Sequence, residues 1–255
     1  MLKMIVMDLD GTLLNDNKNI STYNISILEK CKDKGIALAF ATARSQFAAR
    51  RIIDIIKPDY IILNEGALIT NSNEGIINKK LLSIKTSDGI INDCMNDKNN
   101  IINIAVETEK NYYNTYKDFY HQDYNYGIYY DFTKLLHQKA YKISVEIIKE
   151  QIAYKICEKY KDCKIISNSG EKYYQYIHKN VSKMIGIDII SKYSNINISE
   201  IIAFGDDYND IEMVKECGIG IAMKNGTEKV KSVAKYICES NNEDGIGKWI
   251  EKNIL

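Results

Sequence analysis

Three aspartates crowd one short stretch in the C-terminal part of the chain. In "AFGDDYNDIEM", residues 203–213, Asp206, Asp207 and Asp210 lie within five positions, with Asn209 between them. Two unit negative charges about 4 Å apart repel each other by roughly 4 kcal/mol at an effective dielectric of about 20. Either this loop is well solvated, or a positive group belongs in it.

A second acidic pair follows the first apolar run of the chain. The segment "KMIVMDL", residues 3–9, predicts a buried strand that runs through Asp8 towards a turn at Asp10 and Gly11. Because alternate residues of a strand point the same way, the two carboxylates can approach one site. A hard divalent cation such as Mg²⁺, which prefers oxygen ligands, would relieve the repulsion between converging carboxylates. The alternative is a solvated turn, since Asp and Gly are ordinary turn residues.

Two further polar residues stand where a strand ends or a helix begins. Thr42, followed by Ala43, could hold an anion with its hydroxyl and nearby backbone N–H groups, or it could simply cap a helix. Lys183 lies in the first turn of a predicted helix, where the helix dipole disfavours a positive charge. Ligands of parallel α/β sheets bind outside the carboxyl ends of the strands. We therefore expect the acidic residues, Thr42 and Lys183 to belong to one site.

The elements that must position these residues alternate between strand and helix at both ends of the chain. The first helix is expected to begin at its cap, Ser21, and to end at Gly35. This alternation is typical of a parallel sheet with helices on both faces, so we predict an α/β, Rossmann-like doubly wound core. The predicted strands are 3–9, 36–42, one or two within 60–70, 200–205, 219–223 and 235–238, and the predicted helices are 21–35, 45–57, 182–193, 209–218, 226–234 and a last one near 245–255.

The middle of the chain has a different pattern. Strands of period two, such as 140–148, occur beside separate helices, which predicts an inserted α+β module. We therefore predict a discontinuous core of residues 1–83 and 180–255 and an inserted domain of residues 84–179. The tyrosine-rich segment 111–130 could form a binding face, but amphipathic strand packing is the interpretation we favour.

Composition and charge narrow the class of protein. Of the 255 residues 45% are hydrophobic and 27% charged, as in soluble globular proteins. The 34 basic residues balance the 34 acidic ones, which argues against nucleic acid or an anionic membrane as a partner. Apolar runs are far shorter than the ~20 residues that span a bilayer, and Asp8 precedes any signal-peptide core. We expect a cytoplasmic protein, monomeric or weakly homo-oligomeric, whose six cysteines are reduced and whose three histidines form no metal cluster.

Four short motifs, in this order, resemble those of the haloacid dehalogenase superfamily of phosphohydrolases. They are "DLDGTLL" at 8–14, "ATAR" at 41–44, "VSK" at 181–183 and "GDDYNDIEM" at 205–213. The insert between the second and third motifs resembles the α/β (type IIB) cap of the Cof-type sugar-phosphatase branch, and the C-terminal tail is similar to that branch too. The resemblance covers essentially the whole chain and implies a Rossmann-like core with an inserted cap.

The resemblance implies a role for each acidic candidate. Asp8 would be the nucleophile that forms an aspartyl-phosphate, and Asp10 the general acid and then the general base. Mg²⁺ would be held by Asp8, by the backbone carbonyl of Asp10 and by Asp206. Asp210 would orient Lys183 or a metal-bound water.

The remaining candidates would, by the same resemblance, hold the transferring phosphoryl group. Their part is positioning and charge stabilisation, which is most of what a protein contributes to phosphoryl transfer. They are the side chains of Thr42, Lys183 and Asn209 and the backbone N–H groups near Leu9 and Ala43.

The chain departs from the family pattern at four positions. Ala43 and Met184 stand where the family usually has Gly, and Asp207 stands where a small residue is common. Glu65 stands where Asn is commoner. None of these changes removes a group that the mechanism needs, but Met184 and Glu65 alter the shape and charge of the pocket rim.

These residues and the resemblance predict Mg²⁺-dependent hydrolysis of small phosphorylated metabolites, such as sugar phosphates. A sugar phosphomutase of the same fold is the first alternative, because it would use the same Asp8 and Asp10. A non-enzymatic, receiver-like phospho-acceptor is the second, but Asp10, Lys183 and the long insert are better explained by an enclosed active site. An EF-hand does not fit, because "DLDGTLLNDNKN" lacks the D-x-[DN]-x-[DN]-G pattern and its closing Glu.

Overall fold

The computed structural model describes residues 2–116, 127–167 and 172–255 and divides the chain into two compact units. The core unit combines residues 1–79 with residues 182–255, and the insert unit consists of residues 80–181. The boundaries predicted from the sequence, after residues 83 and 179, lie a few residues from these limits.

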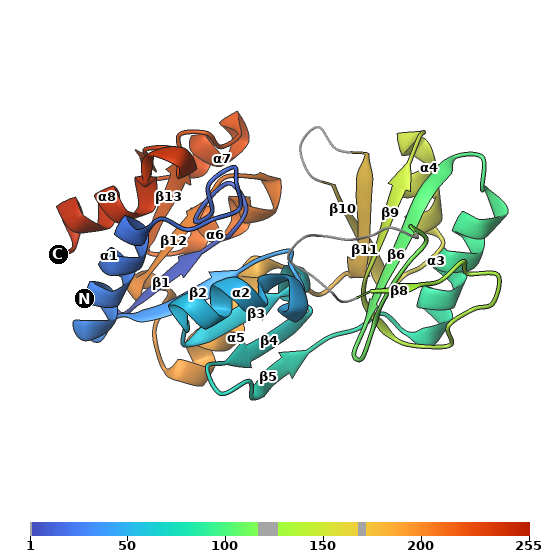
Figure 1. Ribbon diagram of the computed structural model, residues 1–255, viewed down its shortest axis with the longest axis horizontal. Helices are drawn as coiled ribbons and strands as arrows, with labels where there is room; N and C mark the ends of the chain where they lie inside the picture. Colours follow the sequence, from blue (N-terminus) through green and yellow to red (C-terminus); the bar gives the residue numbers. More distant parts are fainter. Residues whose placement is uncertain (1, 117–126, 168–171) are drawn as a thin grey trace. The chain divides into compact units, whose positions relative to one another are not determined.

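An eight-stranded sheet forms the centre of the core unit (Figure 1). Six neighbouring strands are parallel, and β1 lies in the middle of the sheet between β12 and β2. Every residue of β1 and β12 is buried, which explains why these strands are continuous apolar runs. The strand order is β14 (Tyr236–Cys238), β13 (Ile219–Met223), β12 (Ile201–Gly205), β1 (Met4–Met7), β2 (Ala37–Ala41), β3 (Tyr60–Leu63), β4 (Leu68–Asn71) and β5 (Ile76–Lys79).

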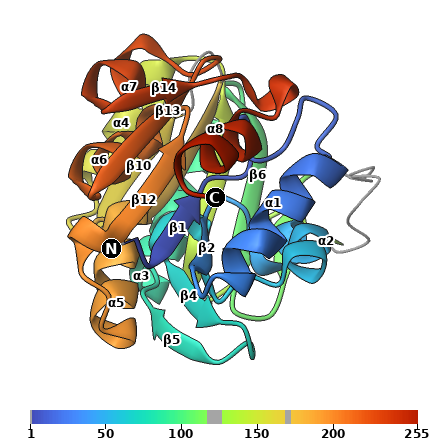
Figure 2. The same ribbon diagram turned by 90° about the vertical axis from the view of Figure 1, so that its left-hand side faces the viewer.

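Helices cover both faces of this sheet, as Figure 2 shows, so the predicted doubly wound α/β core is confirmed. One face carries α1 (Thr22–Asp33), α2 (Gln46–Ile56) and α8 (Gly245–Asn253). The other carries α5 (Lys183–Ser194), α6 (Ile211–Glu216) and α7 (Glu228–Val233), whose apolar side chains pack on the strands. Short 3-10 helices occur at η1 (Asn64–Gly66), η2 (Ile198–Glu200), η3 (Tyr208–Asp210) and η4 (Asn241–Glu243).

Strands β4 and β5 depart from the predicted all-parallel pattern. Both pair antiparallel, β4 with β3 and β5 with β4. The reason is the length of the connection, because only η1 and Ala67 separate β3 from β4, whereas a parallel crossover needs a dozen or more residues. Strand β5 was not predicted at all.

The insert unit is a six-stranded sheet with two helices on one face. The two helices, α3 (Ile84–Asn96) and α4 (Glu150–Glu158), bury Ile90, Cys94 and Ile156 against the sheet. The period-two prediction is confirmed in β9, where residues alternate between buried and partly exposed. The strand order is β10 (Cys163–Ser167), β11 (Tyr173–His178), β9 (Ala140–Ile147), β6 (Ile101–Thr108), β7 (Tyr112–Asn114) and β8 (Ile128–Tyr129).

Part of the tyrosine-rich segment, residues 117–126, lies outside the described residues. Within the described part, Tyr113 is buried, and its ring meets the ring of Tyr130 edge to face, with 5.6 Å between the centroids. Tyr130 in turn packs on Phe132 in the same way. These three rings support the packing interpretation.

None of the helices in residues 2–116, 127–167 and 172–255 combines the length and the apolar character that crossing a membrane requires.

Candidate active site

The strand order brings the candidate residues to one edge of the core sheet. Asp8 follows β1, and its backbone N–H donates to the carbonyl of Phe204 in β12 (3.1 Å). Thr42 follows β2, which pairs with β1 on the other side, and Asp206 follows β12. Since these strands are parallel neighbours, their carboxyl ends meet at the same edge.

Lys183 lies between two carboxylates at this edge. Its Nζ donates to Asp8 Oδ1 (2.7 Å) and to Asp210 Oδ1 (2.6 Å), and all three side chains are buried. Ser182 caps helix α5 by accepting from the N–H of Ile185, which makes Lys183 the first helical residue. Burial lowers the pKa of Lys183, but the charges of Asp210, Asp8 and Glu65 outweigh it and hold that pKa well above its usual range.

Asp210 also organises its own loop. Its Oδ2 accepts from the backbone N–H groups of Asp206 (2.8 Å) and Asp207 (3.1 Å). Gly205 is required beside it, because a Cβ there would lie 2.4 Å from the Cβ of Asp210. Both oxygens of Asp210 therefore accept hydrogen bonds within the protein, and its role in orienting Lys183 or a metal-bound water stays a prediction.

Asp206 lies against the turn that follows Asp8 and Asp10. Its Oδ1 accepts from the hydroxyl of Thr12, and a Cβ on Gly11 would lie 2.3 Å from its Oδ2. Gly11 has a φ of +78°, so it supplies both the turn and the space for this carboxylate. Burial and the charge of Asp210 raise the pKa of Asp206 to about 7, although the hydrogen bond from Thr12 lowers it.

Asp8, Asp206 and Asp210 form a group that could hold a metal ion. One oxygen from each lies within 4.8 Å of the others, in the one such group found among the described residues. Burial raises the pKa of Asp8 well above its usual range, against the charge of Lys183, and the charges of Asp210 and Asp206 raise it further. These buried carboxylates repel one another, and a hard cation bound between them would remove the repulsion. Carboxylate oxygens are the ligands that Mg²⁺ prefers, so the residues present fit Mg²⁺.

The side chain of Asp10 lies outside this group. Arg44 holds it through Nε to Oδ2 (2.6 Å) and Nη2 to Oδ1 (2.8 Å), and Lys18 Nζ adds a contact of 2.9 Å to Oδ1. Burial raises the pKa of Asp10, but the hydrogen bonds and charge of Arg44 outweigh it and lower that pKa to about 2. Only the backbone carbonyl of Asp10, and not its carboxylate, was predicted as a metal ligand, so the ion pair leaves that prediction open.

Comparison with known proteins shows the family of this chain. The sequence matches the haloacid dehalogenase-like hydrolase family over residues 5–250. The chain belongs to this family. The resemblance predicted from the four motifs is thereby confirmed.

Several relatives of this hydrolase span the same length. The 5-amino-6-(5-phospho-D-ribitylamino)uracil phosphatase YcsE of Bacillus subtilis is 28% identical over 257 residues, which cover 100% of this chain and 96% of YcsE. The structure of TM0651 from Thermotoga maritima has a TM-score of 0.85 at 25% identity and covers 100% of this chain and 98% of its own. The subclass IIB sugar phosphatase BT4131 has a TM-score of 0.86 at 24% identity, with 98% of both chains covered, and shows the shared fold.

The residues expected to hold a phosphoryl group lie at the same edge of this hydrolase. Thr42 is buried, and its Oγ1 accepts from the backbone N–H of Arg44 (3.1 Å). Leu9 is buried in the turn after β1, where its carbonyl accepts from Leu14 (2.8 Å). Ala43, between Thr42 and Arg44, lies in the connection from β2 to α2.

Asn209 forms a hydrogen bond with Glu65, a contact that was not predicted from the sequence. Its Nδ2 donates to Glu65 Oε1 (2.9 Å), and Glu65 is buried. Sequence reasoning missed two contacts of this hydrolase, Arg44 with Asp10 and Glu65 with Asn209. The available signals were the place of Arg44 in the "ATAR" motif and the departure of Glu65 from the family pattern.

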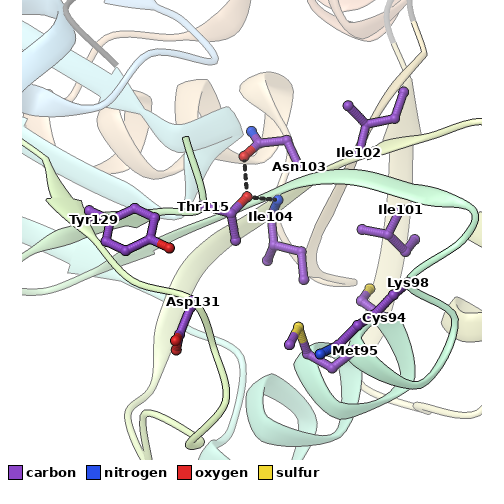
Figure 3. Close-up of a pocket in the computed structure, with 10 residues that line it drawn as sticks. All are labelled: Cys94, Met95, Lys98, Ile101, Ile102, Asn103, Ile104, Thr115, Tyr129 and Asp131. Atoms are coloured by element: carbon purple, nitrogen blue, oxygen red, sulfur yellow. Dashed lines mark hydrogen bonds between the residues drawn. The ribbon is translucent and has the colours of Figure 1, made fainter. Parts of the chain in front are cut away.

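A pocket in the insert unit has a different character (Figure 3). Its volume is about 270 Å³, and its polar contacts include the hydrogen bonds that Thr115 Oγ1 makes with Asn103 Oδ1 (2.6 Å) and the N–H of Ile104 (3.0 Å). The described residues that line it bring no buried carboxylate cluster together, unlike the edge of the core sheet. They are Cys94, Met95, Lys98, Ile101, Ile102, Asn103, Ile104, Thr115, Tyr129 and Asp131.

Proposed function

We propose that this chain is a Mg²⁺-dependent phosphatase that hydrolyses small phosphate monoesters through an aspartyl-phosphate on Asp8. The observation that carries the proposal is the buried ion pair of Asp8 with Lys183, beside Asp206, at the carboxyl end of the central strand. Phosphorylated metabolites such as sugar phosphates are the proposed substrates. The named activity of YcsE, which acts on a phosphorylated ribityl compound, supports this class.

In the first half of the proposed reaction an oxygen of Asp8 attacks phosphorus, and the bond from phosphorus to the leaving alcohol breaks. Asp10 gives a proton to the leaving oxygen. Lys183, with Thr42 and Asn209, holds the charge that spreads over the phosphoryl oxygens. Mg²⁺, held by Asp8, Asp206 and the carbonyl of Asp10, would supply further charge neutralisation when bound.

In the second half, water attacks the aspartyl-phosphate, and Asp10 accepts its proton, which releases phosphate and restores Asp8. The ion pair with Arg44 keeps Asp10 ionised, as a base must be, but it also lowers the basicity of this carboxylate. The acid step requires that this ion pair loosens, and a bound phosphoryl group competing for Arg44 would loosen it.

A chromogenic phosphate ester tests the proposal. We expect release of inorganic phosphate that depends on Mg²⁺, loss of at least 10³-fold of kcat in Asp8→Asn, as for a removed nucleophile, and little change in Asp33→Asn, an exposed acid on α1. In a parallel assay with a sugar phosphate as substrate, an isomerised product without phosphate release would instead identify a phosphomutase. Full activity of Asp8→Asn, or after chelation of the metal, would contradict the proposal.

The location and assembly of the enzyme stay predictions. A cytoplasmic enzyme that is a monomer or a weak homo-oligomer is expected from the composition, and size-exclusion chromatography with light scattering over a range of concentrations tests the assembly.

A further inference from the structure

Glu65 lies in a turn that joins three parts of the active-site edge. Residues Asn64, Glu65 and Gly66 have φ angles of +50°, +60° and +100°, which the first two adopt only at a cost in free energy. The backbone N–H groups of Asn64 and Glu65 donate to the carbonyls of Arg44 (2.9 Å) and Thr42 (3.1 Å). Strain of this kind is retained where neighbouring structure holds it, and it often marks a functional position.

The third residue of the turn is fixed by the start of helix α5. A Cβ on Gly66 would lie 2.4 Å from the carbonyl oxygen of Ser182, so the turn packs directly against the residue before Lys183. The side chain of Glu65 is held by Asn209, whose Nδ2 donates to Oε1. The turn at 64–66 thus contacts residues after β2, at the start of α5 and after β12.

Among the described residues, the second carboxyl oxygen of Glu65 has no hydrogen-bond partner. Only 1% of the residue is exposed, and Oε2 is buried without a hydrogen bond among the described residues. Leaving a charged acceptor buried and unpaired costs more than the roughly 1–3 kcal/mol of a neutral group. Buried polar atoms are nearly always paired, so this oxygen can accept from a donor that the described residues do not supply.

The charges around Glu65 indicate which donor. Four buried or partly buried carboxyl groups (Asp8, Glu65, Asp206 and Asp210) lie near a single buried cation, Lys183, in the described part of the chain. With one divalent cation added, the sum of these formal charges is still −1. An anion without a proton therefore meets repulsion at Glu65, whereas a protonated oxygen could donate to it.

We propose, on the basis of the proposed function, that Glu65 Oε2 accepts a hydrogen bond from a protonated oxygen of the bound phosphate group. Glu65 is then a specificity-determining residue, and the site prefers hydrogen phosphate and the monoanions of phosphate esters to tetrahedral anions that carry no proton. Sulfate is the matched comparison, because it has the shape and charge of hydrogen phosphate but no hydrogen at neutral pH.

Binding of the two anions to the Mg²⁺-loaded protein tests this inference. Calorimetry and competitive inhibition constants are measured at pH 7 for phosphate and sulfate. We expect the wild type to bind phosphate at least about tenfold more tightly than sulfate, as a hydrogen bond to a charged group allows. Glu65→Gln keeps an acceptor for Asn209 but places an NH₂ group at the position of Oε2. We expect this variant to lose most of the preference, mainly by gaining affinity for sulfate.

Glu212→Gln is the matched control, since it removes the same charge from an exposed position on α6 and should leave the preference unchanged. A wild type that binds sulfate as tightly as phosphate would overturn the inference, whatever the fate of the variant. So would an unchanged preference in a folded Glu65→Gln. These results leave the proposed function intact if the wild type still releases phosphate from an ester, whereas a protein that neither binds phosphate nor hydrolyses esters refutes both.

Discussion

Lys183 is the residue on which the electrostatics of the site depend. It is a buried cation between two buried carboxylates, Asp8 and Asp210, and removing one member of such a group leaves an uncompensated charge that costs about 3–5 kcal/mol. The ordinary preference of a helix N-terminus for negative charge is overridden here, because two carboxylates lie closer to the ammonium than the dipole does. Its position in the first turn of α5 is therefore stabilised by these two ion pairs and not by the helix dipole.

Asp206 should make the metal-free protein less stable as the pH rises. Its pKa is raised to about 7, from an unfolded value of about 3.9, so the folded state holds this proton more tightly than the unfolded state does. The stabilisation is complete below about pH 4 and is lost as the pH passes through 7. In EDTA, we expect the Tm of the wild type to fall by several degrees between pH 5 and 8 because of this group. We expect this part of the fall to be absent in Asp206→Asn. Thermal melts of both proteins across this range check it, and parallel curves would contradict the assignment.

Arg44 should control the acid limb of the pH profile. In Arg44→Met the burial of Asp10 remains while its ion pair with Arg44 is lost, so the pKa of Asp10 should rise from about 2, although Lys18 still lowers it. If Asp10 acts as the base, the acid limb of kcat/KM then moves up by more than one pH unit, and its midpoint can be measured between pH 3 and 8. Arg50→Met, which removes an exposed arginine on α2, the helix that follows Arg44, should leave the midpoint in place.

At the scale of elements, the turn at Gly11 helps to position the carboxylate of Asp206, in addition to the strands. Gly11 and Gly35 both have positive φ angles, +78° and +76°. A Cβ on Gly11 would meet Asp206, while a Cβ on Gly35 would meet nothing within 4 Å. A comparison of the two glycines therefore distinguishes the effect of backbone strain from the effect of displacing Asp206, the proposed metal ligand.

We expect Gly11→Ala and Gly35→Ala both to lower Tm, because each places a side chain in the left-handed region at a cost of about 1–2 kcal/mol, and Gly11→Ala to lower it further because its Cβ would also collide with Asp206. Only Gly11→Ala should also raise the Mg²⁺ concentration for half-maximal activity, on the order of tenfold, as for a disturbed support of a metal ligand. A Mg²⁺ titration of phosphate release measures this. Equal Mg²⁺ dependence in the two variants would show that Gly11 supports the turn and not the site.

The predictability of the fold also differs between elements. The apolar runs predicted β1, β2 and β12, and Ser21 caps α1 as expected, because burial on both faces and a capping hydroxyl leave local signals. The pairing of Arg44 with Asp10 left only the place of Arg44 in the "ATAR" motif, which does not identify the partner, since the contact joins side chains 34 positions apart. The antiparallel turn at 64–66 was also invisible, because its positive φ angles occur at Asn64 and Glu65 and not only at a glycine.

For the whole molecule, Mg²⁺ should stabilise the fold by binding the folded chain alone. A ligand at a hundred times its Kd adds about 2.7 kcal/mol, which for a chain of this size raises Tm by roughly 5–10 °C. Melts with and without MgCl₂ measure the shift, and NaCl at equal ionic strength controls for screening. Asp206→Asn should lose most of the shift, and an equal shift with NaCl would count against a specific site.

The central position of β1 has a consequence for synthesis on the ribosome. Met4 pairs with Ile201 across the sheet, so one edge of β1 has no partner until nearly two hundred further residues have been made. At about 5–20 residues per second this takes roughly 10–40 s, during which an apolar strand edge is open to wrong pairings. The insert unit, residues 80–181, is contiguous and emerges in that interval. We therefore expect the inserted domain to fold first and the enclosing core to close only when β12 leaves the ribosome.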